Sequence, residues 1–265
     1  LLDLDSLLTD EDLELRTMVR QFGEQRLRPH IAEWFEKGEV PVRDLAQEIG
    51  KLGLLGMHLQ GYGCSGSTAT AYGLVCQELE AVDSGLRSLV SVQGSLAMFA
   101  IHHWGSEEQR EQWLPGMAAG DLIGCFGLTE PDYGSNPGGM RTTARRDGSD
   151  WVLNGSKTFI SNGINADLVI VVCRTDPDAG HQGISLLVVE RGMEGFERGR
   201  NLDKIGLHAQ DTAELSFTDV VVPKENLLGQ EGEGFIYLMM NLPQERLIIA
   251  AQAVAACEGG VGGRP

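Results

Sequence analysis

The sequence lacks the features that mark several protein classes. Its 265 residues hold five cysteines and no C-x-x-C pair, which argues against a disulfide framework or zinc knuckle and fits a reducing compartment. We expect all five to be buried small side chains. The apolar runs, such as residues 168–173, are far shorter than the ~18 residues that span a bilayer. The six histidines show no metal-ligand spacing, so no metal is expected.

Positive charge is also scarce. The 38 acidic residues outnumber the 21 basic ones, which gives a net charge of −17. A basic face that could bind nucleic acid is therefore not expected. The first residues are acidic, so no secretory signal is visible. With 42% hydrophobic and 22% charged residues, the composition is that of a globular protein and excludes intrinsic disorder.

Helical periodicity dominates residues 1–121. Thr9 with Asp12, and Ser106 with Gln109, have the spacing of capping boxes. Pro115 should end the helix that begins near Ser106. Further helical stretches cover residues 45–52, 67–82 and 87–103. We therefore predict an α-helical N-terminal domain over residues 1–121.

The pattern changes at about residue 122. Short segments rich in β-branched and apolar residues alternate with Gly, Asn and Asp turns, and Asn154-Gly155 is a hairpin signal. No helical period intervenes, which favours an antiparallel, barrel-like sheet over a parallel one. The predicted strands are residues 122–128, 151–160, 168–174, 184–190 and 213–222. We assign residues 122–229 to a middle β-domain.

Residues 230–265 again read as helical, and Pro243 should kink or restart that helix. The glycine-rich end, from Gly259, offers no packing residues, so we interpret this segment as the first helix of a truncated C-terminal helical domain. The fold class predicted is thus multi-domain α and β.

One glycine motif is better explained as a loop. Gly61, Gly63 and Gly66 fit G-x-G-x-x-G, but no strand–turn–helix unit surrounds them. An inter-helix loop is therefore favoured over a dinucleotide-binding turn. No G-x-S-x-G nucleophile elbow occurs either.

The most informative segments are residues 126–135, FGLTEPDYGS, and residues 157–163, KTFISNG. Alone, the first would be read as a turn, although such a loop can direct backbone N–H groups and hydroxyls at a ligand. Together the two resemble the paired flavin-binding strands of the acyl-CoA dehydrogenase family. The resemblance covers essentially the whole chain and implies FAD as cofactor and an acyl-CoA as substrate.

The resemblance assigns site residues by matching position. Thr129 would lie at the pyrimidine edge of the flavin, and Ser135 would also bind the CoA moiety. The family often has Trp-Ile-Thr where this chain has residues 159–161, so Phe159 and Ser161 depart from its pattern. The residues implied to bind the cofactor are Phe126, Gly127, Leu128, Thr129, Gly134, Ser135, Phe159, Ile160 and Ser161.

Glu245 is the candidate catalytic base. The segment LPQERL, residues 242–247, is similar to the long-chain branch, in which the base lies on the helix after the β-domain. Such a carboxylate needs a desolvated pocket that raises its pKa. The alternative is a surface glutamate in a helical ion pair. The neighbours Pro243, Gln244 and Arg246 are expected at the substrate site.

A second resemblance complicates the choice of substrate. Residues 60–141 look like glutaryl-CoA dehydrogenases, whereas residues from about 156 onward look like long-chain acyl-CoA dehydrogenases. In the glutaryl enzymes an Arg-Ser pair, here Arg87 and Ser88, holds the distal carboxylate; Arg87 could equally be structural. His181 and Gln182 match positions that touch CoA in long-chain relatives.

These resemblances imply α,β-dehydrogenation of a long-chain or glutaryl-CoA thioester, with electrons passed to an electron-transfer flavoprotein. The full-length form would be a tetramer, located in the bacterial cytoplasm or the mitochondrial matrix. Two alternatives remain open: a truncated or chimaeric fragment that binds FAD weakly and does not turn over, and an acyl-CoA oxidase.

Overall fold

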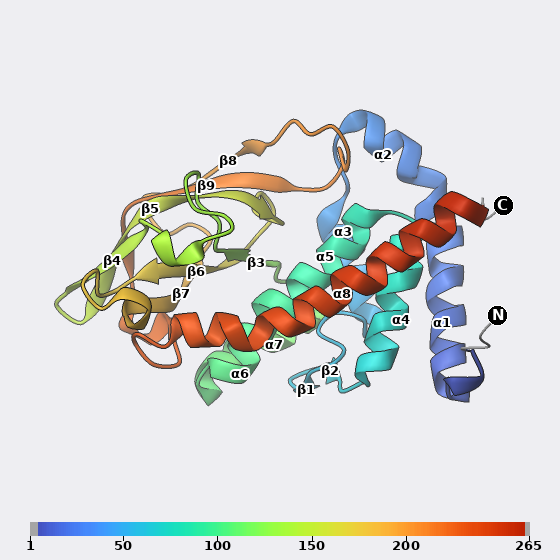
Figure 1. Ribbon diagram of the computed structural model, residues 1–265, viewed down its shortest axis with the longest axis horizontal. Helices are drawn as coiled ribbons and strands as arrows, with labels where there is room; N and C mark the ends of the chain where they lie inside the picture. The colour runs from blue at the N-terminus through green and yellow to red at the C-terminus, as the bar shows by residue number, and fades with distance from the viewer. Residues whose placement is uncertain (1–4, 263–265) are drawn as a thin grey trace.

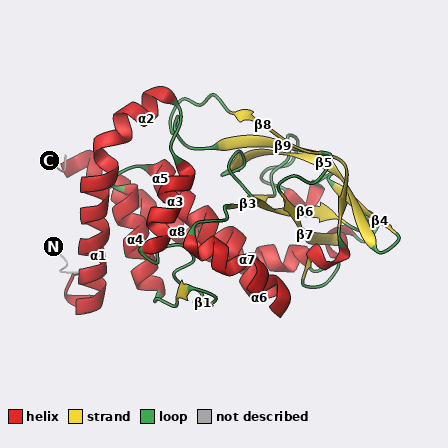
Figure 2. Cartoon of the chain, turned by 180° about the vertical axis from the view of Figure 1, so that it is seen from behind, coloured by secondary structure: helices red, strands yellow, loops and turns green. Residues whose placement is uncertain are grey.

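The computed structural model describes the backbone of residues 5–262 and the side chains up to residue 259. Helices fill one half of the molecule and a twisted sheet fills the other (Figure 1). The last helix, α8 (Gly234–Gly262), starts beside the sheet and ends beside the N-terminal helices. Figure 2 shows the same division from behind. The predicted order of a helical domain, a sheet-rich domain and a final helix is confirmed.

The helical half follows from its caps and apolar faces. Thr9 and Asp12 form a complete capping box, as do Ser106 and Gln109, so both predicted helix starts are confirmed. The α-helices are α1 (Asp10–Phe22), α2 (Ile31–Lys37), α3 (Val42–Lys51), α4 (Ala69–Glu80), α5 (Ser84–Ser91), α6 (Phe99–Trp104) and α7 (Glu107–Ala119). Short 3-10 or π segments are η1 (Asp5–Leu7), η2 (Gly23–Leu27), η3 (Arg28–His30) and η4 (Val92–Met98).

The π-helical segment η4 joins α5 to α6 without a break and contacts the first strand of the sheet. The Gln93 amide holds this junction together. Its Nε2 atom donates to the carbonyls of Met117 and Leu122 at 3.0 and 2.7 Å, and its Oε1 atom accepts from the Gly124 N–H at 2.6 Å. A buried amide satisfied on both sides fixes the helix relative to the sheet.

The main sheet has the order β10-β7-β6-β4-β5-β9-β8, and β3 also pairs with β6. Most pairs are antiparallel as predicted, but β3 runs parallel to β6, and β4 touches β6 in parallel through one residue pair. The strands are β3 (Gly124–Gly127), β4 (Thr143–Asp147), β5 (Asp150–Ser161), β6 (Leu168–Arg174), β7 (Ile184–Glu190), β8 (Phe196–Asn201), β9 (Thr212–Val222) and β10 (Leu227–Leu228). The 3-10 turns η5 (Pro137–Gly139), η6 (Gly180–Gly183) and η7 (Lys224–Asn226) lie between them.

Two local predictions about the sheet and the glycine motif can be judged directly. Asn154-Gly155 does not form a hairpin: it lies inside β5 at a bulge against β9. The hairpin of this region joins β4 to β5, where Asp147 pairs with Asp150. The glycine motif of residues 61–66 lies in the connection between two helices, as predicted, where it forms most of a small hairpin of the two-residue strands β1 (Gln60–Gly61) and β2 (Cys64–Ser65).

The helix end predicted at Pro115 is wrong. Pro115 lies inside α7, where Trp113 and Leu114 beside it are buried and hold the helix against its neighbours. Pro243 lies inside α8, so the helix does not restart there, and the predicted kink stays a prediction. Tertiary packing offsets the one backbone hydrogen bond that each proline removes. The helix continues through Gly259 as far as Gly262, within the segment that the sequence predicted to be helical.

All five cysteines are free thiols. Cys76, Cys125 and Cys173 are buried and Cys64 is half-buried, but Cys257 is exposed, so the prediction that all five are buried is wrong for it. Among the described residues, no helix is long and apolar enough to cross a membrane, and no group of acidic, His and Cys side chains could hold a metal ion.

Candidate active site

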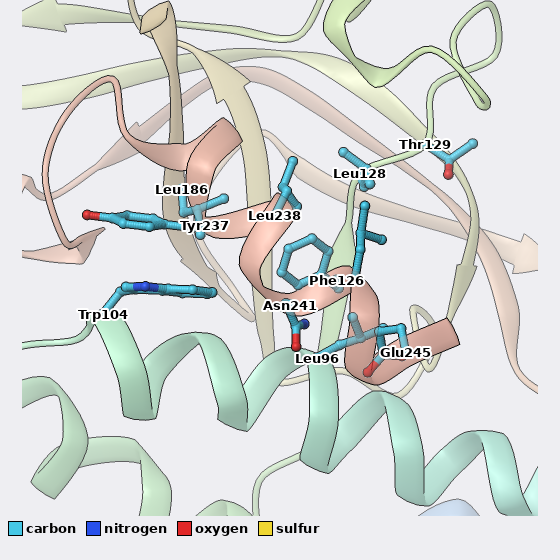
Figure 3. A pocket seen from close by; sticks show the side chains of 11 residues that line it. Leu96, Trp104, Phe126, Leu128, Thr129, Leu186, Tyr237, Leu238, Asn241 and Glu245 are labelled. Atoms are coloured by element: carbon cyan, nitrogen blue, oxygen red, sulfur yellow. The ribbon is translucent and has the colours of Figure 1, made fainter. Parts of the chain in front are cut away.

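A cavity of about 190 Å³ lies where α8 passes between the helical half and the sheet. Its wall is mainly apolar or aromatic. Three further lining residues carry a hydroxyl, an amide and a carboxyl group: Thr129, Asn241 and Glu245. Figure 3 shows them together with most of the apolar wall. The apolar and aromatic lining consists of Leu96, Trp104, Phe126, Leu128, Leu186, Tyr237, Leu238 and Leu242.

Glu245 brings a carboxyl group into this apolar surrounding. Its Oε1 atom is buried and has no hydrogen-bond partner among the described residues. Burial raises the pKa of Glu245 above its usual value, although the Ser95 hydroxyl and the Arg87 charge act in the opposite direction. A desolvated carboxylate with an unused lone pair is suited to accept a proton from a bound molecule.

The two motifs identified in the sequence lie side by side. The Thr158 N–H donates to the Thr129 carbonyl at 2.9 Å. Next to it, the Lys157 ammonium donates to the Glu130 carboxylate at 2.8 Å and to the Leu128 carbonyl at 3.1 Å. The loop after β3 is thereby attached to β5 close to the cavity.

Phe159 has an unusual conformation. Its φ is +57°, at a bulge of β5, and its ring is 69% exposed. A left-handed phenylalanine in a strand is strained, and backbone strain of this kind is frequent at ligand sites. A flat aromatic ligand would cover the exposed ring, so the residues present fit an isoalloxazine here.

The other predicted cofactor residues lie in β3, in β5 and in the loop that follows β3. Phe126, Leu128 and Thr129 line the cavity, and Gly127 is buried in β3 beneath it. Ser161 lies at the end of β5, where its hydroxyl accepts from the Gln210 amide at 2.9 Å. Ile160 is buried, whereas Gly134 and Ser135 are exposed in the loop that follows β3.

Arg87 and Ser88 are buried on α5 and do not line the cavity. The Arg87 guanidinium donates to the Glu80 carboxylate at 3.0 Å and to the Ser91 hydroxyl at 2.8 Å. The Ser88 hydroxyl accepts from the same Gln210 amide that bonds Ser161. Arg87 therefore already has a carboxylate partner within the chain.

The remaining predicted residues surround the site without lining the cavity. His181 and Gln182 are exposed on η6, and the His181 ring stacks on Phe235 of α8 with centroids 4.2 Å apart. Pro243 and Arg246 are exposed and Gln244 is half-buried on α8. Their roles in substrate binding stay predictions.

Sequence reasoning missed several cavity residues. Asn241 is the most informative, because it precedes Glu245 by four residues and shares its helix face, a spacing visible in the sequence. Trp104 and Tyr237 stack with ring centroids 4.6 Å apart. They lie on separate helices, so no local sequence pattern predicts their contact. The same holds for Leu96 and Leu186.

Comparison with known proteins identifies two matching domains. The acyl-CoA dehydrogenase N-terminal domain matches residues 9–121, and the acyl-CoA dehydrogenase middle domain matches residues 125–220. The mitochondrial long-chain specific acyl-CoA dehydrogenase of Sus scrofa is 48% identical over 92% of this chain and 57% of its own length.

Solved structures give the same result. A glutaryl-CoA dehydrogenase from Mycobacterium smegmatis, in complex with FADH2, superposes with a TM-score of 0.90 and 50% identity over 96% of this chain and 64% of its own. A chain from a structure described as an electron transferring flavoprotein of Acidaminococcus fermentans has a TM-score of 0.91 and 40% identity, with 95% of this chain and 66% of that one covered.

Both kinds of relative that the sequence resembles are therefore found, each matching more than nine-tenths of the chain. The chain spans 57% of the length of the Sus scrofa relative and 64% of the M. smegmatis chain. From the matching domains and the identities, the chain belongs to the acyl-CoA dehydrogenase family of FAD-dependent oxidoreductases.

Proposed function

We propose that this protein carries out the FAD-dependent α,β-dehydrogenation of an acyl-CoA thioester, with Glu245 as the base that removes the α-proton. The observation that carries the proposal is the buried, unpartnered Oε1 atom of Glu245 in an apolar cavity that also contains Thr129 and Phe126. When bound, FAD would supply a hydride acceptor for the β-hydrogen.

The chain's own residues would hold that cofactor and exclude water. Thr129 and Ser161 offer hydroxyls at the junction of the two motifs, and Phe159 offers an exposed ring. The leucines and aromatic residues of the cavity would surround the acyl chain, so the carboxylate stays desolvated while it acts.

The same observations favour an uncharged acyl chain over a glutaryl group. The cavity wall is apolar, and Arg87, the predicted partner of a distal carboxylate, is engaged by Glu80 and lies outside the lining. Glutaryl-CoA stays the alternative substrate, because the M. smegmatis relative is a glutaryl-CoA dehydrogenase.

The partners are inferred from the family resemblance. We infer that electrons pass to an electron-transfer flavoprotein and that the full-length protein assembles as a tetramer. We expect the protein in the bacterial cytoplasm or the mitochondrial matrix, since relatives come from bacteria and from mitochondria. An acyl-CoA oxidase would differ from this proposal by forming peroxide.

A second candidate is a chain that folds but does not turn over. Ile236, Met240 and Leu247 are between 51% and 63% exposed on α8, an apolar face that would normally be covered. FAD bound by this chain alone would then be weak, and purified protein would be colourless or aggregated.

The test is anaerobic titration of FAD-loaded protein with palmitoyl-CoA and with glutaryl-CoA, monitored by bleaching of the flavin spectrum. We expect bleaching by palmitoyl-CoA, none in Glu245→Gln, and retained flavin binding in that variant. Bleaching that persists in Glu245→Gln would refute the base assignment. Protein that binds no FAD would support the second candidate.

A further inference from the structure

Asn241 carries a second unused acceptor in the same cavity. Its side chain is 6% exposed, and its Nδ2 atom donates to the Ser95 carbonyl at 3.0 Å. That bond fixes which end of the amide is the oxygen. The remaining Oδ1 atom is buried without a hydrogen-bond partner among the described residues.

Asn241 and Glu245 lie one helical turn apart on α8, and both line the cavity. Figure 3 shows both side chains leaving the helix toward the segment that carries Leu96. Residues with this spacing have Cβ atoms about 5–6 Å apart. The chain therefore places two unsatisfied acceptor oxygens, Oδ1 and Oε1, as neighbours in an apolar space.

Two buried hydrogen-bond acceptors that lie side by side destabilise the fold unless one of them carries a proton that it can donate to the other. No proton is available while Glu245 is a carboxylate. Once Glu245 is protonated, its new O–H group is a donor, and Asn241 Oδ1 is an acceptor with nothing else to bind.

We propose that Asn241 is a positioning residue whose Oδ1 atom accepts a hydrogen bond from the Glu245 carboxyl group after that group has taken a proton. The inference rests on the proposed function. In that reaction the substrate α-C–H bond breaks and an O–H bond forms on Glu245. The electron pair left on the α-carbon forms the new C=C bond as the β-hydrogen leaves as hydride, which reduces the bound flavin by two electrons.

Other groups face Glu245 and must stay constant in a test. Tyr72 and Cys76 lie on α4, Arg87 lies on α5, where it pairs with Glu80 of α4, and Ser95 lies on η4. Ser95 donates its hydroxyl to the Ser91 carbonyl at 2.7 Å. Variants at Asn241 change none of these side chains.

The experiment measures the titration of Glu245 by ¹³C NMR in FAD-loaded protein labelled at the glutamate Cδ atoms. The Glu245 resonance is assigned by its loss in Glu245→Gln. Asn241→Leu keeps a branched side chain of similar shape but removes the acceptor, together with the Nδ2 donor to the Ser95 carbonyl. Because a hydrogen bond to the neutral form raises a carboxyl pKa, we expect the Glu245 pKa to fall by about one unit. Asn241→Asp adds a second carboxylate, so the pair should titrate in two steps, one of them above the wild-type pKa.

The matched control is Met240→Leu, on the exposed side of α8, which should leave the titration unchanged. A Glu245 pKa that stays constant or rises in Asn241→Leu would overturn the inference, as would a single unshifted step in Asn241→Asp. These outcomes are independent of flavin bleaching. If Glu245→Gln still bleaches, the base assignment fails, whatever the titrations show.

Discussion

The Nζ atom of Lys157 lies 2.8 Å from the Oε1 atom of Glu130, and neither side chain is more than 4% exposed. The Glu130 carboxylate also accepts from the backbone N–H groups of Arg141 and Thr142 at 2.6 and 3.0 Å. This pair joins the Thr-Glu-Pro turn after β3 to strand β5, the two segments by which the sequence was first linked to flavin binding.

We expect Lys157→Met to destabilise the protein strongly. The change leaves a buried carboxylate without its counter-ion, and breaking a buried pair in this way costs about 3–5 kcal/mol. Urea denaturation measures the loss. The control is Arg145→Met, because Arg145 and Asp147 form an exposed pair at 4.0 Å that should contribute no more than about 1 kcal/mol. Equal losses in the two variants would contradict the role of the buried pair.

Glu245→Gln should stabilise the protein at neutral pH. Burial raises the pKa of Glu245, so the folded state disfavours the carboxylate that the unfolded chain carries freely. This loss of folding stability is present in full at pH values above the raised pKa of Glu245 in the folded state. It disappears below the ordinary glutamate pKa of about 4.3, where both states are protonated. The free energy of unfolding of Glu245→Gln should therefore exceed that of the wild type at pH 7.5, and this difference should vanish near pH 4.

Urea midpoints at the two pH values provide the measurement for this prediction. Glu111→Gln, at an exposed position of α7, serves as the control and should stay within about 0.5 kcal/mol of the wild type. A Glu245→Gln variant that is less stable than the wild type at pH 7.5 would show that the carboxylate stabilises the fold.

Gly120→Ala should destabilise the protein far more than Gly148→Ala. Both glycines have positive φ, at +80° and +63°, which costs an L-residue about 1–2 kcal/mol. A Cβ at Gly120 would also lie 2.2 Å from the Ala46 carbonyl oxygen, whereas none of the atoms described lies within 4 Å of one at Gly148. The difference between the two melting temperatures reports mainly this clash with the backbone of α3, and similar temperatures would contradict the close packing of α7 on α3.

Phe159→Gly should weaken FAD binding while it leaves the stability of the flavin-free protein nearly unchanged. Glycine removes the cost of a left-handed phenylalanine, about 1–2 kcal/mol, but loses about 0.5–1 kcal/mol to backbone entropy. The stability of flavin-free protein should therefore change by less than about 1 kcal/mol, while FAD binding, measured by fluorescence quenching, weakens.

The contrasting variant for Phe159 is Phe217→Ala on the neighbouring strand β9. The Phe217 ring is 3% exposed, so its removal should cost about 3–5 kcal/mol. If Phe159→Gly destabilised the flavin-free chain to the same extent, Phe159 would be a core residue and not a ligand contact.

The periodic pattern of apolar residues predicted the long helices and strands, because each of them buries one face or both faces. The strand over residues 168–174 is buried along nearly its whole length in β6, and the helix caps at Thr9 and Ser106 need only residues three apart. Local rules were sufficient for these elements.

Local rules failed where tertiary contacts override them. Asn154-Gly155 has the composition of a turn, yet Asn154 bonds to Asp219 of β9, at 2.9 and 3.0 Å. A Cβ at Gly155 would lie 2.4 Å from the Thr142 hydroxyl, so glycine is needed there for close strand packing. Neither contact is visible from neighbours in the sequence.

The candidate site was predictable only in part. Glu245 and Thr129 were found through the family resemblance, and the structure brings both to one cavity. The partner of Arg87 was not anticipated, because Glu80 lies seven residues away on a different helix, across the turn between α4 and α5. Asn241 was overlooked although its spacing from Glu245 is regular.

Helix α8 touches the sheet near its first turns and α4 further along, and the cavity lies between these two contacts. Any rotation of the helical half against the sheet would therefore shift the Glu245 carboxyl relative to strand β3. Under the proposed function, the distance between the Glu245 carboxyl and a bound flavin would depend on how the two halves dock, and substitutions at their interface would alter reaction rates without contacting any ligand.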